Sequence, residues 1–238
     1  MHRPVLDVCL TPALFPLMQS DDAIVVVIDI LRATSSMCIA FEYGATEIIP
    51  VRTVEESLAY KAKGYLIGAE RHGEKIEGFD LGNSPFSYME DRIKGSKIAL
   101  TTTNGTQAIN AAKNAAGVVI GSFLNVDALC DYLLQQNKKV ICLCSGWKNS
   151  FNLEDTLLAG CVVEKLHSHF GQSDMRDAAI AARHLYNMAK GDLYAFLDNS
   201  SHRKRLANLH IEDDVRYCLQ TGMTSKVPFL DQQKLICC

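Results

Sequence analysis

Short runs of β-branched and other apolar residues alternate along this chain with segments of helical periodicity, and this alternation restricts the fold more than any other feature. The runs predict strands at residues 24–30, 47–51, 65–69, 98–101, 118–120 and 140–144. Helices are predicted at 34–43 and 54–63, each followed by a glycine, and again from Asn104, from Asn125 and after Asn152. Such regular alternation predicts an α/β fold in three α/β/α layers, with a largely parallel or mixed sheet.

The chain is expected to form one α/β unit over residues 1–238. Its 238 residues, 48% of them hydrophobic, are enough for a large core, and no repeat or low-complexity linker divides them. Helical patterns dominate residues 174–238, where only one further strand is predicted, around 227–230. We expect this helix-rich extension to form a cap or an oligomer surface.

Charge and hydropathy restrict the classes of partner. The net charge is −3 and no basic stripe is present, so we expect no nucleic-acid binding. The densest basic stretch, "HRKRL" at 202–206, is interpreted as an exposed helix face, with an anion-binding patch as the alternative. No apolar run reaches the roughly eighteen residues that cross a bilayer, so we expect a cytoplasmic protein without membrane contact. The nine cysteines lack a paired Cys-x-x-Cys spacing and are expected to be reduced.

Polar side chains gather directly after five of the predicted strands. In chain order they are Asp29, Arg32, Thr34 and Ser35; Glu70, Arg71 and His72; Thr101, Thr102, Thr103 and Asn104; Ser122 and Asn125; and Ser145, Lys148, Glu154 and Asp155. Ligands of parallel sheets bind beyond the carboxyl ends of the strands, where the following helices point their N-termini. The sequence therefore predicts a polar site at this edge of the sheet.

Several of these residues also have a structural interpretation. Thr34, Asn104 and Asn125 are candidate helix N-caps, and "NLED" at 152–155 fits a capping arrangement with acids in the first turn. A purely structural interpretation is less suitable for Asp29, because a carboxylate at the end of an apolar run is costly to bury without a partner. A functional role is favoured for Asp29.

Two longer segments add to the predicted site. In "TTTNGT" at 101–106, Gly105 permits close approach of the backbone to a ligand, while hydroxyls and helix-start N–H groups face an anion such as phosphate or sulfonate. The alternative is a threonine-rich strand end followed by a capped helix. The long loop at 68–85 carries Glu70, His72, Asp80 and Asn83, and loops of this length in compact domains are usually functional or disordered.

Acidic residues for a hard cation beside basic residues for an anion favour divalent-metal chemistry on a phosphorylated substrate. Familiar phosphotransfer motifs are missing. There is no G-x-x-x-x-G-K-[ST] loop, Leu31 stands where a paired-aspartate phosphatase would have its second aspartate, and no cysteine has an arginine six residues later. These absences disfavour P-loop enzymes and two classes of covalent phosphatase.

The blocks "DILRATSSM", "GFDLGNSP", "TTTNGTQAI", "GSFLN" and "FNLEDTLLAG", followed by "SSH" at 200–202 and "DDVRYCL" at 213–219, together resemble the 2-phosphosulfolactate phosphatase family over most of the chain. The resemblance implies a magnesium-dependent hydrolase of α/β/α fold that removes phosphate from 2-phospho-3-sulfolactate, a step towards coenzyme M. By motif position it implies active-site roles for Asp29, Arg32, Glu70, Asp80, Asn83, Thr103, Asn104, Ser145 and Asp155. The chain departs from the pattern at Trp147, Lys148 and Arg203, where small residues are more common.

Our sequence-based hypothesis is that Asp29, with Asp155 or another carboxylate, holds Mg²⁺ against a substrate phosphate. Arg32 and the turn at 101–106 would bind the phosphate oxygens, and Glu70, His72 or Asp80 would serve as the base. The predicted substrate contacts are Arg32, Asn83, Thr102, Thr103, Asn104, Gly105, Thr106, Ser145 and Lys148. The expected partner is a small phosphorylated acid, with or without a sulfonate, and a homo-oligomer is expected on general grounds only.

The alternative function is a non-catalytic protein that binds an anionic metabolite at the same strand ends. Clustered carboxylates disfavour it, because acids near a phosphate site repel the ligand unless a cation lies between them.

Overall fold

The strands form a mixed sheet in a computed structural model that describes residues 5–18, 20–71, 73–170, 175–206, 209 and 211–237. The strands are β1 Leu6–Cys9, β2 Ile24–Ile28, β3 Glu47–Pro50, β4 Leu66–Arg71, β5 Glu74–Lys75, β6 Lys97–Thr101, β7 Gly117–Gly121, β8 Val140–Cys144, β9 Phe229–Asp231 and β10 Lys234–Ile236. The helices are α1 Ala33–Glu42, α2 Val54–Lys61, α3 Gly105–Ala112, α4 Val126–Gln136, α5 Leu153–Leu166, α6 Asp177–Ala189, α7 Leu193–Phe196, α8 Ser201–Leu206 and α9 Glu212–Cys218. Short 3₁₀ turns at Pro12–Leu17, Pro85–Tyr88, Asp91–Ile93 and Phe123–Asn125 complete the described elements.

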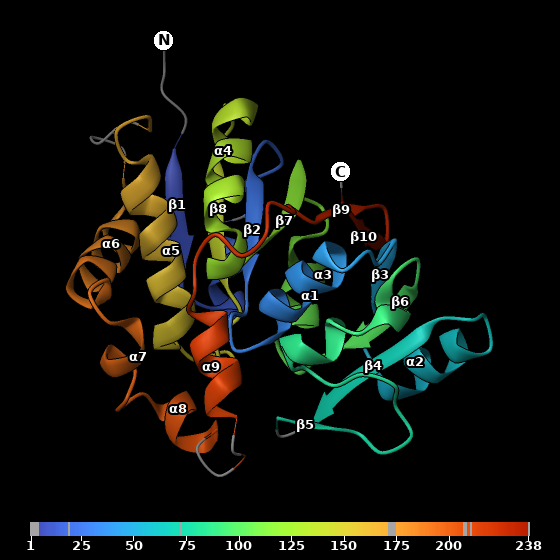
Figure 1. The fold of residues 1–238 in the computed structure, drawn as a ribbon. Helices are drawn as coiled ribbons and strands as arrows, with labels where there is room; N and C mark the ends of the chain where they lie inside the picture. Colours follow the sequence, from blue (N-terminus) through green and yellow to red (C-terminus); the bar gives the residue numbers. More distant parts are fainter. Residues whose placement is uncertain are drawn as a thin grey trace.

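The strand order is β1-β8-β2-β7-β9-β10-β3-β6-β4-β5. Two parallel groups, β1-β8-β2-β7 and β3-β6-β4, are separated by the β9–β10 hairpin, which is antiparallel to β7 on one side and to β3 on the other. Figure 1 shows the C-terminal segment, in red, crossing from α9 to this hairpin. The last residues of the described chain therefore connect the two halves of the sheet.

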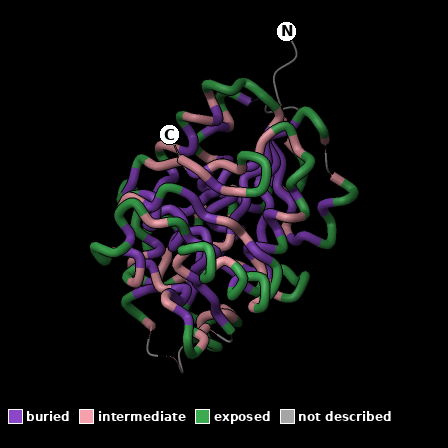
Figure 2. The backbone as a smooth tube through the Cα atoms, turned by 90° about the vertical axis from the view of Figure 1, so that its right-hand side faces the viewer, coloured by how far each residue is buried: buried purple, intermediate pink, exposed green. Residues whose placement is uncertain are grey.

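Strand β2 shows why the sheet is covered on both faces. Ile24, Val26 and Ile28 belong to the core that includes α4 and α5, whereas Val25 and Val27 belong to the core that includes α1 and α3. Successive residues of a strand point to opposite faces, so a continuous apolar run is the pattern of a strand buried on both sides. Buried backbone, purple in Figure 2, accordingly runs through the centre of the molecule.

The predicted fold class is confirmed, and the boundaries of the elements are close to the predicted ones. The first predicted strand ends early, at Ile28, so that Asp29 lies outside it. The short strands β1, β5 and β10 were not predicted, because each has at most four residues and includes a charged side chain. The strand expected around residues 227–230 is present as β9, and β10 follows it. None of the described helices is long and apolar enough to span a membrane.

Helices α5 and α6 pack closely at Gly160. An ideal Cβ placed on Gly160 would lie 2.0 Å from the carbonyl oxygen of Ala182 and 2.8 Å from Cβ of Tyr186. Any side chain at this position would therefore push the two helices apart, and α6 covers α5 along one side of the molecule (Figure 1).

We predict that Gly160→Ala lowers the free energy of unfolding by about 1–3 kcal/mol or more, because overpacking a tight contact displaces backbone. Gly191→Ala is the matched control, since nothing lies within 4 Å of a Cβ at that position. Denaturant titration of both variants measures the effect. A Gly160→Ala protein as stable as the control would contradict the helix contact.

Candidate active site

A cavity of about 240 Å³ lies beyond the carboxyl ends of β2, β4, β6 and β8. It is lined by Asp29, Leu31, Arg32, Glu70, Gly73, Asn83, Thr102, Thr103, Asn104, Trp147, His202 and Arg205. These residues come from both parallel halves of the sheet and from α8. The predicted position of the site, at the carboxyl edge, agrees with this cavity.

The start of α1 meets the start of α3 beside Asp29. The backbone N–H of Asp29 donates to Oγ1 of Thr34 at 3.1 Å, and the N–H of Thr34 donates to the carbonyl of Asp29 at 2.9 Å. A Cβ on Gly105 would lie 3.0 Å from Oδ2 of Asp29 and 3.0 Å from Cβ of Ala33. Glycine therefore allows the α3 N-terminus to approach the Asp29 carboxylate, and both helices direct their positive ends to the cavity.

Arg32 joins three segments at the cavity wall. Its guanidinium donates to the carbonyl of Gly73 at 2.6 Å and lies 3.3 Å from the carboxylate of Asp214 on α9. The residue is only 4% exposed. A guanidinium has five N–H donors, so these contacts leave others for an anionic ligand.

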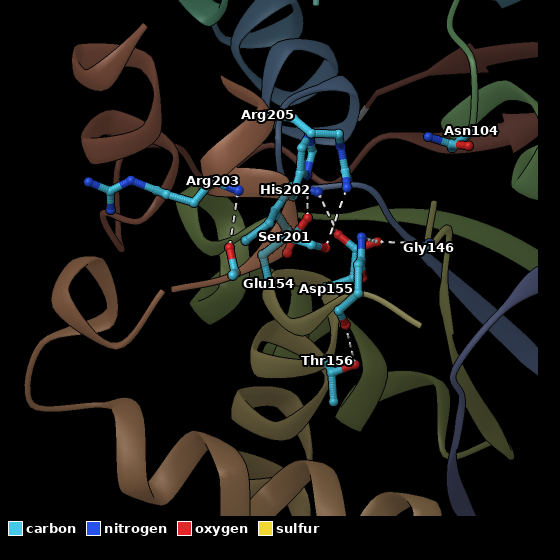
Figure 3. Close-up of polar contacts among 12 residues, drawn as sticks. Asn104, Gly146, Glu154, Asp155, Thr156, Ser201, His202, Arg203 and Arg205 are labelled. Atoms are coloured by element: carbon cyan, nitrogen blue, oxygen red, sulfur yellow. Dashed lines mark hydrogen bonds and ion pairs between the residues drawn. The ribbon is translucent and has the colours of Figure 1, made fainter. Parts of the chain in front are cut away.

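Asp155 stabilises the floor of the site and does not cap its own helix. Its carboxylate accepts hydrogen bonds from the backbone N–H of Ile30 at 3.0 Å, the N–H of Gly146 at 3.2 Å and the side-chain amide of Asn152 at 2.9 Å. Figure 3 shows Asp155 with its contact to Gly146. Asp155 thus connects the segments that follow β2 and β8.

Burial and mutual repulsion raise the pKa values of the two aspartates. For Asp29, desolvation is the largest cause and the nearby Asp155 carboxylate is the second, with smaller contributions from Glu70 and Glu154, opposed by His202. For Asp155, desolvation and Glu154 raise the pKa, while its three hydrogen bonds oppose the change. Asp29 forms no side-chain hydrogen bond with the described residues, so we assign to Asp29 the proton that the pair retains near neutral pH.

His202 and Glu154 form a pair that was not predicted: Glu154 was listed among the polar residues at the strand ends, whereas His202 was not assigned to the site. Nδ1 of His202 is hydrogen bonded to Oε1 of Glu154, although the two residues are 48 positions apart. Figure 3 shows these side chains turned toward each other, with Arg203 pointing away from them. The available signals were the family block at 200–202 and Glu154 within "NLED", but neither revealed that α8 packs against α5 at this point.

The basic stretch at 202–206 is exposed only in part, so its interpretation as a solvated helix face was incomplete. His202 and Arg205 line the cavity, whereas Arg203 stacks on Tyr194, with its guanidinium 3.5 Å from the ring centroid. Lys204 is exposed.

Most of the other predicted site residues lie in or beside the cavity. Asp29, Arg32, Glu70, Asn83, Thr102, Thr103 and Asn104 line it; Gly105, Thr106, Ser145, Lys148 and Asp155 do not. Glu70 accepts a hydrogen bond from the N–H of Gly73 at 2.6 Å, and its other oxygen lies 3.5 Å from Oγ1 of Thr103. Among those outside, Thr106 donates its hydroxyl to the carbonyl of Thr102 at 2.8 Å, and Ser145 is buried next to Gly146.

Asp80 does not line the cavity. The carboxylate of Asp80 accepts from the backbone N–H of Ile67 at 2.9 Å, near the opposite end of β4 from Glu70. It therefore anchors the loop to the strand. His72 lies outside the described residues.

The candidate N-caps also differ from the sequence-based interpretation. Thr34 lies inside α1, and Asn104 caps α3 by position but not with its side chain. Instead, Oδ1 of Asn104 accepts from the backbone N–H of Lys148 at 3.4 Å. Asn125 accepts from the N–H of Ser122 at 3.0 Å and so closes a capping box one turn before α4.

The cavity wall offers oxygen donors of the kind that Mg²⁺ prefers. No three His, Cys, Asp or Glu side chains of the described residues are placed to bind one ion together. Mg²⁺ usually binds through one or two carboxylates and is completed by water and substrate phosphate. Asp29 faces the cavity, and Oε2 of Glu154 and Oδ1 of Asn83 are buried without a hydrogen-bond partner in the described part of the chain. Asp29, Glu70 and Asn83 present oxygen atoms at the cavity wall, the ligand type that a hard cation requires.

Together the fold and the cavity define an α/β protein with an acid-rich anion site at the carboxyl edge of its sheet. Residues 9–233 match the family described as 2-phosphosulpholactate phosphatase. The chain is 42% identical over 205 residues, covering 86% of this chain and 88% of the relative, to the "Probable 2-phosphosulfolactate phosphatase" of Thermotoga petrophila. The relative of the same name in Caldanaerobacter subterraneus subsp. tengcongensis is 39% identical, and the match covers 87% of each chain. The one in Symbiobacterium thermophilum is 36% identical, and the match covers 90% of this chain and 93% of the relative.

The chain therefore belongs to the 2-phosphosulfolactate phosphatase family and is a phosphoric monoester hydrolase. This finding confirms the family resemblance. It also favours an enzyme over the non-catalytic binding protein that the sequence had left as the alternative.

The raised pKa of Asp29 predicts a definite pH dependence of stability in the absence of divalent ions. A carboxyl group whose pKa rises from 3.8 to about 8 on folding binds its proton more tightly in the folded state. The free energy of unfolding should then fall as pH increases between these two values. Each unit of pKa difference between the folded and unfolded states corresponds to about 1.4 kcal/mol of unfolding free energy. Asp29→Asn removes the buried charge, so at pH 8 in EDTA it should be more stable than the unchanged protein.

Thermal unfolding from pH 5 to pH 9 tests this prediction. Asp131→Asn, at an exposed position of α4, removes the same charge and should leave the pH profile as it is. An Asp29→Asn profile parallel to that of the unchanged protein would show that Asp29 does not carry the raised pKa.

Proposed function

We propose that this protein hydrolyses the phosphate ester of 2-phospho-3-sulfolactate, or of a closely similar phosphorylated hydroxy acid, in a Mg²⁺-dependent reaction. The products would be the hydroxy acid and inorganic phosphate. The observation that carries the proposal is the meeting of the Asp29 carboxylate, the Arg32 guanidinium and the N-terminus of α3 in one cavity. The names of the relatives support the substrate class.

Asp29 is the principal candidate to hold Mg²⁺, and Asp155 lies behind it, outside the cavity wall. When bound, the ion would supply positive charge to the phosphate oxygens and lower the pKa of a water molecule. The hydrogen bonds that Asp155 accepts keep the backbone segments next to Asp29 in place. Asp155 would therefore act mainly on the position of the ligands.

The phosphate would be oriented by groups of opposite charge on the cavity wall. Arg32 is held by Gly73 and Asp214, so its remaining N–H groups are preorganised. Thr102, Thr103 and Asn104 line the cavity just before α3, where helix N–H groups and the helix dipole favour an anion. This arrangement would place the ester for in-line attack by water without large movements of the protein.

Two side chains are suited to proton transfer. Of the three bases considered from sequence, Glu70 is the one that lines the cavity among the described residues, and it would accept a proton from the attacking water. In its imidazolium form, His202 would donate the proton on Nε2 to the leaving alkoxide oxygen, while Nδ1 stays hydrogen bonded to Glu154. The buried Glu154 carboxylate, 1% exposed, fixes the orientation of the His202 ring.

Phosphate release from 2-phospho-3-sulfolactate and from simpler phosphomonoesters tests the proposed reaction. We expect release with Mg²⁺, none above background in excess EDTA, and recovery when Mg²⁺ is added back. Asp29→Asn should reduce the rate by roughly tenfold or more and weaken the Mg²⁺ response, whereas Asp131→Asn should behave as the unchanged protein. Full activity in EDTA, or a normal Mg²⁺ response in Asp29→Asn, would contradict the proposal.

The role of His202 as general acid predicts a dependence on the leaving group. His202→Gln should lower kcat for 2-phospho-3-sulfolactate by about 10²–10⁴, since general acid catalysis contributes that much. The loss should be much smaller for 4-nitrophenyl phosphate, whose leaving group departs without protonation. Steady-state kinetics on both esters measure the loss of kcat in His202→Gln. Glu154→Gln, which changes the partner of His202, should give a smaller loss of the same kind. An equal loss on both esters would assign His202 a structural role.

A further inference from the structure

A second cavity lies directly beside the acid-rich one and has a different chemical character. It has a volume of about 250 Å³ and is lined by Arg52, Arg71, Thr102, Thr103, Trp147 and Lys148. We call this set the basic side pocket. Thr102, Thr103 and Trp147 line both cavities, so one small molecule could extend from one into the other.

The three cationic residues of the basic side pocket come from distant parts of the sequence. Arg52 follows β3, Arg71 ends β4, and Lys148 lies in the loop between β8 and α5. No carboxylate of the described residues lines the pocket. Three acids lie near the pocket without lining it. Glu56 accepts from the backbone N–H of Arg52 at 2.8 Å, and the exposed Glu55 interacts electrostatically with Arg71. Glu70, on the wall of the main cavity, has a carboxylate oxygen 3.5 Å from Oγ1 of Thr103.

Three like charges around one small cavity repel one another, and the described protein supplies no anion inside the pocket to offset this repulsion. The main cavity beside it has the opposite composition, with Asp29 and Glu70 on its wall. A ligand matched to both would place one anion, accompanied by a divalent cation, near the acids and another anion among the bases.

Trp147 forms the wall between the two cavities and is held from both sides. The guanidinium of Arg205, in the main cavity, lies 4.4 Å from the centroid of the Trp147 ring, and Nζ of Lys148 lies 5.8 Å from it. The backbone N–H groups of Trp147 and Ser150 each donate to the other's carbonyl at 2.9 Å. This tight turn directs Lys148 into the side pocket, while Asn104 accepts from its backbone N–H.

We propose that the basic side pocket binds a second anionic group, a carboxylate or sulfonate, of the same small molecule whose phosphate ester occupies the main cavity. Arg52, Arg71 and Lys148 provide the charge, the hydroxyls of Thr102 and Thr103 lie between the two groups, and Trp147 limits their separation. This inference rests on the proposed phosphatase reaction and assigns its selectivity to particular residues. Esters that lack a second anion should be poor substrates.

A matched pair of esters measures this selectivity. 2-Phospholactate carries a carboxylate next to the ester carbon, and isopropyl phosphate has a methyl group in its place. The double variant Arg52→Gln/Lys148→Gln removes two positive charges at exposed positions and keeps a polar side chain at each. We expect the ratio of kcat/KM for 2-phospholactate to that for isopropyl phosphate to fall about tenfold or more, since hydrogen bonds to charged groups are the strong ones.

The control variant Lys94→Gln/Lys138→Gln removes the same charge from exposed positions outside both cavities and should leave the ratio unchanged. Thermal unfolding of both double variants verifies that they fold. An unchanged ratio in Arg52→Gln/Lys148→Gln, with the fold intact, would overturn the inference while leaving the phosphatase reaction in place.

Direct binding gives a test that does not depend on turnover. Trp147 is the only tryptophan of the chain, so its fluorescence reports on the wall between the cavities. Titration with 3-sulfolactate, which has carboxylate and sulfonate but no phosphate, should change this fluorescence in a saturable way. The double variant should need about tenfold more ligand. Absence of saturable binding to the unchanged protein, or equal affinity in the double variant, would contradict the pocket even if phosphate release is observed.

Discussion

The close burial of several carboxylates is the interaction on which the rest of the site depends. Asp29 lies near Asp155, Glu70 and Glu154, and burial raises its pKa further. Such a cluster is tolerated only where neighbouring groups offset the charge. Arg32, His202 and the N-termini of α1 and α3 supply part of that compensation, and each is held in place by contacts with distant segments.

The C-terminal third of the chain has a larger part in this compensation than its helical sequence pattern indicated. Helix α8 contributes His202 and Arg205 to the cavity, and α9 contributes Asp214 to Arg32. The β9–β10 hairpin then enters the sheet between β7 and β3. The C-terminal segment that closes the site therefore also connects the two parallel halves whose strand ends form it.

The two adjoining cavities differ in the charge of the side chains that line them, so each suits a different part of a ligand. Acids face the position proposed for Mg²⁺ and the ester, and bases surround the pocket proposed for a second anion. Trp147, one of the positions at which the chain departs from its family's common pattern, stands between them. Its contacts with Arg205 and Lys148 show how a bulky side chain at this position is accommodated without filling either cavity.

Local sequence determined the strands and helices, their alternation and the edge at which polar groups gather, because β-branched runs and helical periodicity act over a few residues. Asp29, Arg32 and the turn at 101–106 were recognisable on that basis, since they directly follow apolar runs. Only the tertiary structure paired His202 with Glu154, moved Asp80 away from the cavity to the backbone of Ile67, and inserted the C-terminal hairpin into the sheet. These contacts join residues far apart in sequence, and they depend on how whole elements pack, which no local propensity specifies.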